Sequence, residues 1–164
     1  MYTIRPSLPI YKLNWHTLQY ALYVAINTEK LIRKGKLPNK WITYPACAAC
    51  VQSKICGIIS YGYSGKYSKD KINDSRFVPF LRNKLTELAP IGTKYDPENN
   101  PIGNCAEQVA MNLQIKECKR CNFCKHSQED IYNNQEVSSS YRPRTLEFIK
   151  RCSNCSYYFG NETF

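Results

Sequence analysis

The chain has 164 residues, a length that fits one domain able to bury a core without disulfides to support it. Its composition, 43% hydrophobic and 22% charged, is ordinary for a globular protein, and no segment approaches the length of a transmembrane helix or shows a signal peptide. The net charge of +10 favours a polyanionic partner such as nucleic acid or a nucleotide, unless it serves solubility or is offset by an acidic inhibitor.

The N-terminal part of the chain predicts one helix and one hairpin. Residues 1–13 contain two prolines and are expected to be irregular. A helix is expected over 15–34, where apolar residues recur at helical spacing. Two short apolar runs, 44–51 and 55–63, flank a polar break and predict a hairpin of buried strands, although the alanines also allow a helix over 46–51.

The middle of the chain alternates between loops and helices. A polar, basic loop is expected over 64–75, followed by a helix over 77–88 that ends before a proline. The segment 93–104 is rich in turn-forming residues and leads into a helix over 105–116. Residues 125–144 are polar and are expected to be mobile.

The C-terminal part predicts a strand over 145–151 and a short helix over 152–160. The resulting order of helices and strands indicates a layered α/β fold in which helices cover a small sheet. We expect one domain over 1–164 that carries a cysteine-containing and polar insertion at 118–144.

Two short motifs point to a reaction. The first is GNCAE at 103–107, where a helix is expected to begin, and the second is RCSNC at 151–155, where a strand is expected to lead into a helix. A catalytic zinc ion takes three protein ligands and keeps one position open for water. If the two helices begin side by side, the thiols of Cys105, Cys152 and Cys155 meet around one ion.

Glu107 follows Cys105 by two residues and is the candidate proton carrier of a hydrolytic deamination. Such a reaction takes a proton from water and gives one to the ring nitrogen and the leaving ammonia, and one carboxylate can do both in sequence. Structural explanations remain open: Glu107 can complete a capping box with Asn104, and Cys152 with Cys155 can belong to a closed structural zinc site.

The segments GNCAEQVA, SYGYSG and IKRCSNCSYYFG resemble the YwqJ-like deaminases of bacterial polymorphic toxin systems, within the cytidine deaminase-like superfamily. The resemblance implies a three-layer α/β/α sandwich with a small mixed sheet and a minimal C-terminus. It also implies a toxin domain that acts on nucleic acid or nucleotides and pairs with an immunity protein. By motif match it assigns zinc to Cys105, Cys152 and Cys155 and the general acid/base role to Glu107.

Two residues depart from the pattern of this superfamily. Cys105 stands where many members have histidine, and a third thiolate makes the zinc site more negative and its water less acidic. Arg151 stands where relatives commonly have proline, and its positive charge can offset that of the thiolates. Ser64, Gly65, Asn104 and Arg151 are candidate substrate-binding residues. For Ser64 and Gly65, an ordinary turn after a strand is the alternative.

The chain has nine cysteines, an odd number that does not suit a disulfide framework. Close spacing of cysteines favours metal binding and a reducing compartment, so we expect a cytoplasmic site of action, with or without export, and no membrane partner. Cys118, Cys121 and Cys124, with His126 nearby, are candidates for a second, structural metal site. An iron–sulfur site and a loop of unliganded thiols are the alternatives.

From the residues and the resemblance together, we expect a zinc-dependent hydrolytic deaminase of cytosine or adenine, acting on single-stranded or extruded bases of nucleic acid. A zinc-binding module that holds nucleic acid without catalysis is one alternative. A deaminase of free nucleosides or nucleotides is the other.

Overall fold

The computed structural model describes residues 9–40, 43–66, 74–94, 97, 100–120 and 126–161. Its helices are α1 (Ile10–Arg33), α2 (Pro79–Leu85), α3 (Ala106–Arg120), α4 (Gln128–Asn133) and α5 (Ser153–Phe159). Its strands are β1 (Ala48–Ser53), β2 (Ile59–Tyr63), β3 (Gln135–Val137), β4 (Ser140–Tyr141) and β5 (Phe148–Ile149).

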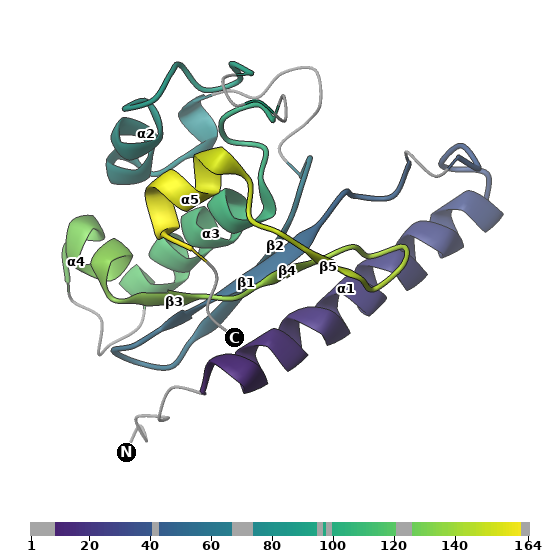
Figure 1. The fold of residues 1–164 in the computed structure, drawn as a ribbon, viewed down its shortest axis with the longest axis horizontal. Coiled ribbons are helices and arrows are strands. Elements are labelled where there is room, and N and C mark those ends of the chain that lie inside the picture. Colours follow the sequence, from purple (N-terminus) through teal and green to yellow (C-terminus); the bar gives the residue numbers. More distant parts are fainter. Residues whose placement is uncertain are drawn as a thin grey trace.

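A sheet lies between two layers of helices, with α1 on one face and the other helices gathered around α3 on the opposite face (Figure 1). The sheet has five strands in the order β2-β1-β4-β5, and β3 also pairs with β1. The predicted α/β class and the layered arrangement are therefore observed. A mixed sheet was expected, whereas each strand pair in the described part of the chain is antiparallel.

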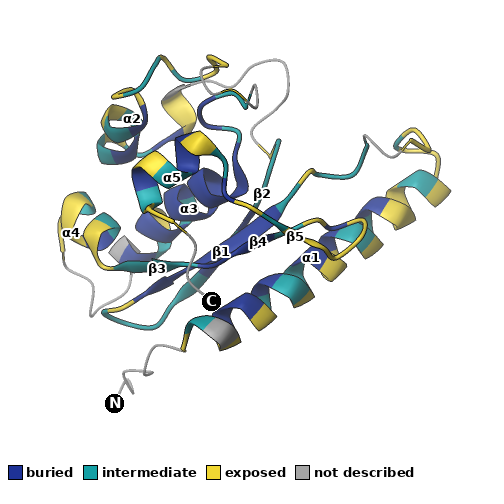
Figure 2. Ribbon diagram, viewed as in Figure 1, coloured by how far each residue is buried: buried dark blue, intermediate teal, exposed yellow. Residues whose placement is uncertain are grey.

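β1 is the centre of this arrangement. All six of its residues are buried, because helices cover it on both faces (Figure 2). It pairs with β2 along most of its length, from Ala48 opposite Tyr63 to Gln52 opposite Ile59. The predicted hairpin is thus present, and β1 extends through Ser53, where a polar break was expected.

Helix α1 packs on the sheet through Leu13, Ala21 and Val24, which are buried and lie three to eight residues apart. Thr28 on the same face donates its hydroxyl proton to the Val24 carbonyl oxygen and so satisfies its own polar group. The helix begins at Ile10, inside the segment expected to be irregular. None of the helices in the described ranges combines the length and apolarity needed to cross a bilayer.

The segment 125–144 contributes more structure than its polarity suggests. Residues 121–125 lie outside the described residues, and the chain then forms α4, β3 and β4. Ser127 caps α4 by accepting a hydrogen bond from the Asp130 amide. The buried Ser138 accepts one from the Cys50 amide, and the Ser139 amide donates to the Asn14 side chain. Such bonds allow polar residues to be buried in the sheet.

Helix α3 lies directly on β2 because Gly62 has no side chain. A Cβ atom at Gly62 would lie 2.5 Å from the Ala106 carbonyl oxygen and 2.5 Å from the Ala110 amide nitrogen. Both are backbone atoms, which cannot turn aside as the end of a side chain can. This contact places the first turn of α3, and therefore the GNCAE motif, against the sheet.

We predict that Gly62→Ala lowers the free energy of unfolding by about 3 kcal/mol or more, because the added methyl group would push α3 away from β2. Gly35→Ala is the matched control: Gly35 has φ of +69° and nothing within 4 Å of the new Cβ, so only backbone strain of about 1 kcal/mol is expected. Urea unfolding of both variants tests this. Equal losses for the two variants would show that the α3–β2 contact is not tight.

Candidate metal centre

Three sulfur atoms converge where two helices begin. Cys105 directly precedes α3, Cys152 is the N-cap residue of α5, and Cys155 lies in the first turn of α5. The sulfurs of Cys105 and Cys152 are 3.5 Å apart, and all three sulfurs lie within 4.8 Å of one another. The predicted convergence of the two motifs is therefore observed.

This spacing suits a tetrahedral metal ion with thiolate ligands. Zinc–sulfur bonds of about 2.3 Å place tetrahedral sulfurs about 3.8 Å apart, close to the separation of Cys105 and Cys152. No fourth histidine, cysteine or acidic residue belongs to the group among the residues that the structure describes. A three-cysteine set of this kind can hold a metal ion and leave one coordination position open.

The three thiols are not equivalent in the absence of metal. Hydrogen bonds from the thiols of Cys105 and Cys155 lower the pKa of Cys152 to about 3. The bond to Cys152 in turn raises the pKa of Cys105 well above its usual value, and burial does the same for the pKa of Cys155. Cys152 is therefore the thiol that ionises most readily: its sulfur lies 3.5 Å from the Cys105 sulfur and accepts a hydrogen bond from the Cys155 amide, whereas the Cys155 thiol donates to Oε2 of Glu107.

Glu107 lies beside this cluster and is buried, with 3% of its surface exposed. Its Oε1 atom accepts a hydrogen bond of 2.8 Å from the Ser140 hydroxyl, and its Oε2 atom lies 3.6 Å from the sulfur of Cys155. Burial raises the pKa of the Glu107 carboxyl above its ordinary value. A carboxyl group with a raised pKa is suited to accept and then donate a proton near neutral pH.

The capping-box alternative for Glu107 does not match this geometry. Its carboxylate accepts hydrogen bonds from the Ser140 hydroxyl on β4 and from its own backbone amide, while the Asn104 amide donates to the Pro101 carbonyl oxygen. The side-chain oxygen of Asn104, the expected N-cap residue, is buried without a hydrogen-bond partner in the described residues. Asn104 also lines the pocket described below.

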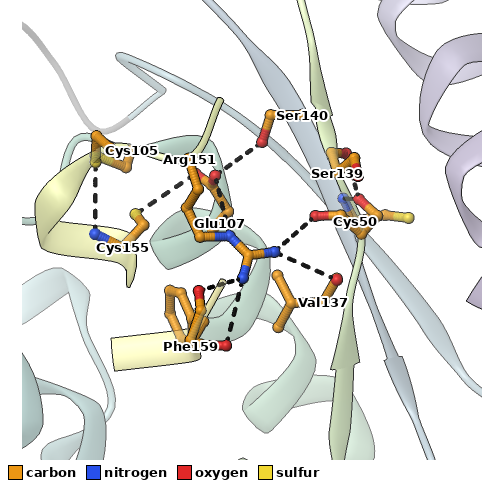
Figure 3. A network of polar contacts seen from close by, with 12 residues as sticks. Cys50, Cys105, Glu107, Val137, Ser139, Ser140, Arg151, Cys155 and Phe159 are labelled. Atoms are coloured by element: carbon orange, nitrogen blue, oxygen red, sulfur yellow. Dashed lines mark hydrogen bonds and ion pairs between the residues drawn. The ribbon is translucent and has the colours of Figure 1, made fainter. Parts of the chain in front are cut away.

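Arg151 connects the second motif to the rest of the structure (Figure 3). Its guanidinium group donates to the carbonyl oxygens of Phe159 and Gly160 at the end of α5 and to that of Ser138 before β4. Its Nε atom lies 4.0 Å from Oε1 of Glu107, and both side chains are almost fully buried. The cation expected to offset the thiolate charge is therefore held inside the protein, where it contacts Glu107 and fixes α5.

A pocket of about 750 Å³ opens over the cluster. Cys105, Glu107 and Cys152 line it, and so do two exposed cations, Arg142 and Lys150. Pockets of this size hold small organic ligands. The candidate metal site, a buried carboxylate and two cationic side chains thus face one cavity.

Of the other candidate substrate residues, Ser64 and Asn104 line this pocket and Gly65 supports it. The Ser64 hydroxyl accepts a hydrogen bond of 3.1 Å from the Cys47 amide. Gly65 donates its amide proton to the Asn104 carbonyl oxygen at 3.1 Å, which joins the end of β2 to the approach to α3.

Of the three cysteines in the candidate second metal site, the structure describes one. Cys118 is buried in the last turns of α3, whereas Cys121 and Cys124 lie outside the described residues. His126 is exposed just before α4.

Sequence reasoning missed Ser140 and Cys47 as pocket residues. Ser140 lies in a run of three serines within a polar segment, where no local pattern distinguishes it. Cys47 precedes β1 and lines the pocket, and burial raises the pKa of its thiol to about 12. Of the pocket residues that had not been predicted, only Arg142 and Lys150 belong to a feature noted in the sequence, the excess of basic residues.

We predict that the chain binds one zinc ion, or one cobalt ion as a spectroscopic probe, through three thiolates. Cys105→Ser, Cys152→Ser and Cys155→Ser should each lower the affinity by at least about tenfold. Cys50→Ser is the control, because Cys50 is buried against α1, where its sulfur contacts Thr17. Metal analysis and the cobalt–thiolate absorption band provide the measurement, and an unchanged band in all three variants would exclude this site.

We also predict that metal affinity rises with pH. The pKa values of Cys105 and Cys155 are raised, so both hold protons at pH 7, whereas Cys152 with its pKa of about 3 does not. Binding then displaces two protons, and the association constant should rise by up to about a hundredfold per pH unit between pH 6 and 8. Titration against a competing chelator, with calorimetry in two buffers, counts the protons. A pH-independent affinity would contradict the expected protonation state.

No protein-family model matches the chain, and no curated protein or solved structure is significantly similar to it. The functional conclusion therefore rests on the site itself. The structure shows a mixed α/β fold that presents a three-cysteine cluster, Cys105, Cys152 and Cys155, close enough to hold a metal ion.

Proposed function

We propose that this protein is a zinc-dependent hydrolytic deaminase of cytosine or adenine bases. The observation that carries the proposal is the position of Glu107: its buried carboxylate lies 3.6 Å from the sulfur of Cys155 and lines the same pocket as Cys105 and Cys152. A carboxylate beside a three-ligand zinc site is the arrangement that nucleobase deamination requires.

The ion, when bound, supplies a Lewis acid that makes a hydroxide nucleophile available near neutral pH. The protein contributes proton transfer and positioning. Glu107 takes a proton from the attacking water with one carboxylate oxygen and returns it to the ring nitrogen of the base. It then moves the proton of the added hydroxyl group to the exocyclic amine, whose C–N bond breaks so that ammonia leaves. Ser140 donates to Oε1 and holds the carboxylate in one orientation, so that Oε2 remains directed towards the cluster. The raised pKa of Glu107 supports both halves of this transfer.

The charges of the site support a metal with three thiolates. A divalent ion with three thiolates carries a net charge of −1, and the ionised Glu107 adds another negative charge. Arg151 places a positive charge 4.0 Å from the Glu107 carboxylate, in surroundings where charges interact more strongly than in water. This pairing lowers the cost of ionising Glu107 beside the anionic cluster.

The proposed substrate is a base within nucleic acid. Arg142 and Lys150 line the pocket and are exposed, so they can contact phosphate groups next to a base that has entered it. The net charge of +10 favours association with a polyanion. The resemblance of the two motifs to YwqJ-like deaminases extends the proposal to a toxin or effector role in the cytoplasm, with a cognate immunity protein as partner.

A closed, purely structural zinc site is the principal alternative. Such a site requires a fourth protein ligand and no access for a substrate. Cys105 and Cys152 instead line an open pocket. Among the residues that the structure describes, three cysteines make up the cluster. Both features support a catalytic centre over a closed structural site.

We predict that Glu107→Gln lowers the rate of deamination by at least about a hundredfold while zinc content is retained, because the amide cannot accept the proton. Glu129→Gln, on the exposed side of α4, is the matched control and should retain activity. DNA and RNA from cells that express each variant are sequenced for C-to-T and A-to-G changes. Free cytidine and adenosine are assayed in parallel.

Three results would revise the proposal. Changes that persist with Glu107→Gln would exclude this residue as the proton carrier. Turnover of free nucleosides without changes in nucleic acid would show that the substrate is a free nucleoside and not a base within nucleic acid. No deamination of any of these substrates by the zinc-loaded protein would overturn the proposal.

A further inference from the structure

A second pair of sulfurs lies away from the metal centre. The sulfur of Cys56, in the turn between β1 and β2, is 3.7 Å from the sulfur of Cys118 near the end of α3. Cys118 follows Cys105 by 13 residues, which corresponds to about 20 Å along a helix. The pair is therefore independent of the cluster that opens into the pocket.

The turn that carries Cys56 is held in place by its own hydrogen bonds. The hydroxyl oxygen of Ser53 accepts from the amides of Ile55 and Cys56 at 3.1 and 3.2 Å. The Gly57 amide donates to the Ser53 carbonyl oxygen at 2.9 Å, and Gly57 adopts a φ of +74°, a conformation that favours glycine. The position of Cys56 is thus set by a compact turn.

Cys118 is equally well positioned. Its side chain is completely buried in α3, and its sulfur lies 3.8 Å from the same Ser53 hydroxyl. Cys56 is partly exposed. Of the two residues, Cys56 is therefore the one that a reagent from solvent meets first.

We propose that Cys56 and Cys118 form a reversible disulfide, with a low-molecular-weight disulfide such as oxidised glutathione as the oxidant. The Cys56 thiolate attacks one sulfur of the oxidant, breaks its S–S bond, and releases one thiolate that takes up a proton. The Cys118 sulfur, after losing its proton, attacks the Cys56 sulfur of the mixed disulfide and releases the second thiol. Two electrons and two protons pass from the protein thiols to the oxidant.

Closing the bond requires the sulfurs to approach from 3.7 Å to about 2.05 Å. The link joins residues 62 positions apart and ties the β1–β2 turn to α3. Because the closed loop is long, cross-linking reduces the conformational entropy of the unfolded chain substantially. The bond stabilises the fold in oxidising surroundings and opens again where thiols are kept reduced.

The test uses the full-length, zinc-loaded protein equilibrated with oxidised glutathione and then alkylated. Peptide mapping without reduction should recover a Cys56–Cys118 linked peptide, and the melting temperature should rise by about 5–10 °C over the reduced protein. Cys56→Ser and Cys118→Ala should each abolish both effects. Cys50→Ala, which removes another buried thiol of the sheet, should retain the linked peptide.

The mapping reads the wild-type chain directly, so the result does not depend on whether a variant folds or whether the metal centre is catalytic. Linked peptides that join Cys56 or Cys118 to other cysteines would overturn the proposal. Recovery of both Cys56 and Cys118 in alkylated form after the oxidation step would also overturn it. An oxidised protein that melts at or below the temperature of the reduced form would overturn the stabilising role of the bond.

Discussion

The close contact of α3 with the sheet is the constraint on which the site depends. Since Gly62 has no side chain, the backbone of α3 at Ala106 and Ala110 lies directly on β2. The helix that begins there carries Cys105 just before its first residue and Glu107 in its first turn. The height of a candidate metal ligand and of the proposed proton carrier above the sheet is therefore set by contact between backbones, which changes less than contact between long side chains.

α3 is buried on nearly all sides, and its polar residues connect it to the elements around it. Asn112 accepts from the Val78 amide and donates to the Arg76 carbonyl oxygen, which anchors the approach to α2. Gln114 donates to the carbonyl oxygen of Ile58 before β2 and to the side chain of Gln135 on β3. These bonds satisfy polar groups that would otherwise be costly to bury, and they specify which segments surround the helix.

Arg151 completes the site from the other side. It ties the end of α5 to the chain before β4, so α5, which carries Cys152 and Cys155, and the segment that carries Ser140 are held by one side chain. The same guanidinium group lies beside Glu107. A single buried cation thus holds in place the helix with the candidate metal ligands, the Glu107 carboxylate and its hydrogen-bond donor Ser140, and a change at Arg151 would disturb all three.

Much of the local structure could be predicted from the sequence. The periodic apolar residues of α1 and α3, the hairpin of β1 and β2, and the helix that begins after Cys152 are present near the expected positions, because each depends on neighbouring residues. The polar segment after residue 125 was expected to be mobile, yet it forms β3 and β4. Its serines become buried only because distant partners such as the Cys50 amide and Asn14 bond to them.

The residue types and spacing of the two motifs were enough to identify three candidate metal ligands and a carboxylate, since two short segments contain all four. The sequence by itself could not show that Ser140 orients Glu107, that Arg151 is enclosed by backbone carbonyls, or that Cys118 lies against Cys56. These contacts join residues between 8 and 62 positions apart. Only the packing of α3 and α5 against the sheet brings them within bonding distance, and no local pattern of residues encodes that packing.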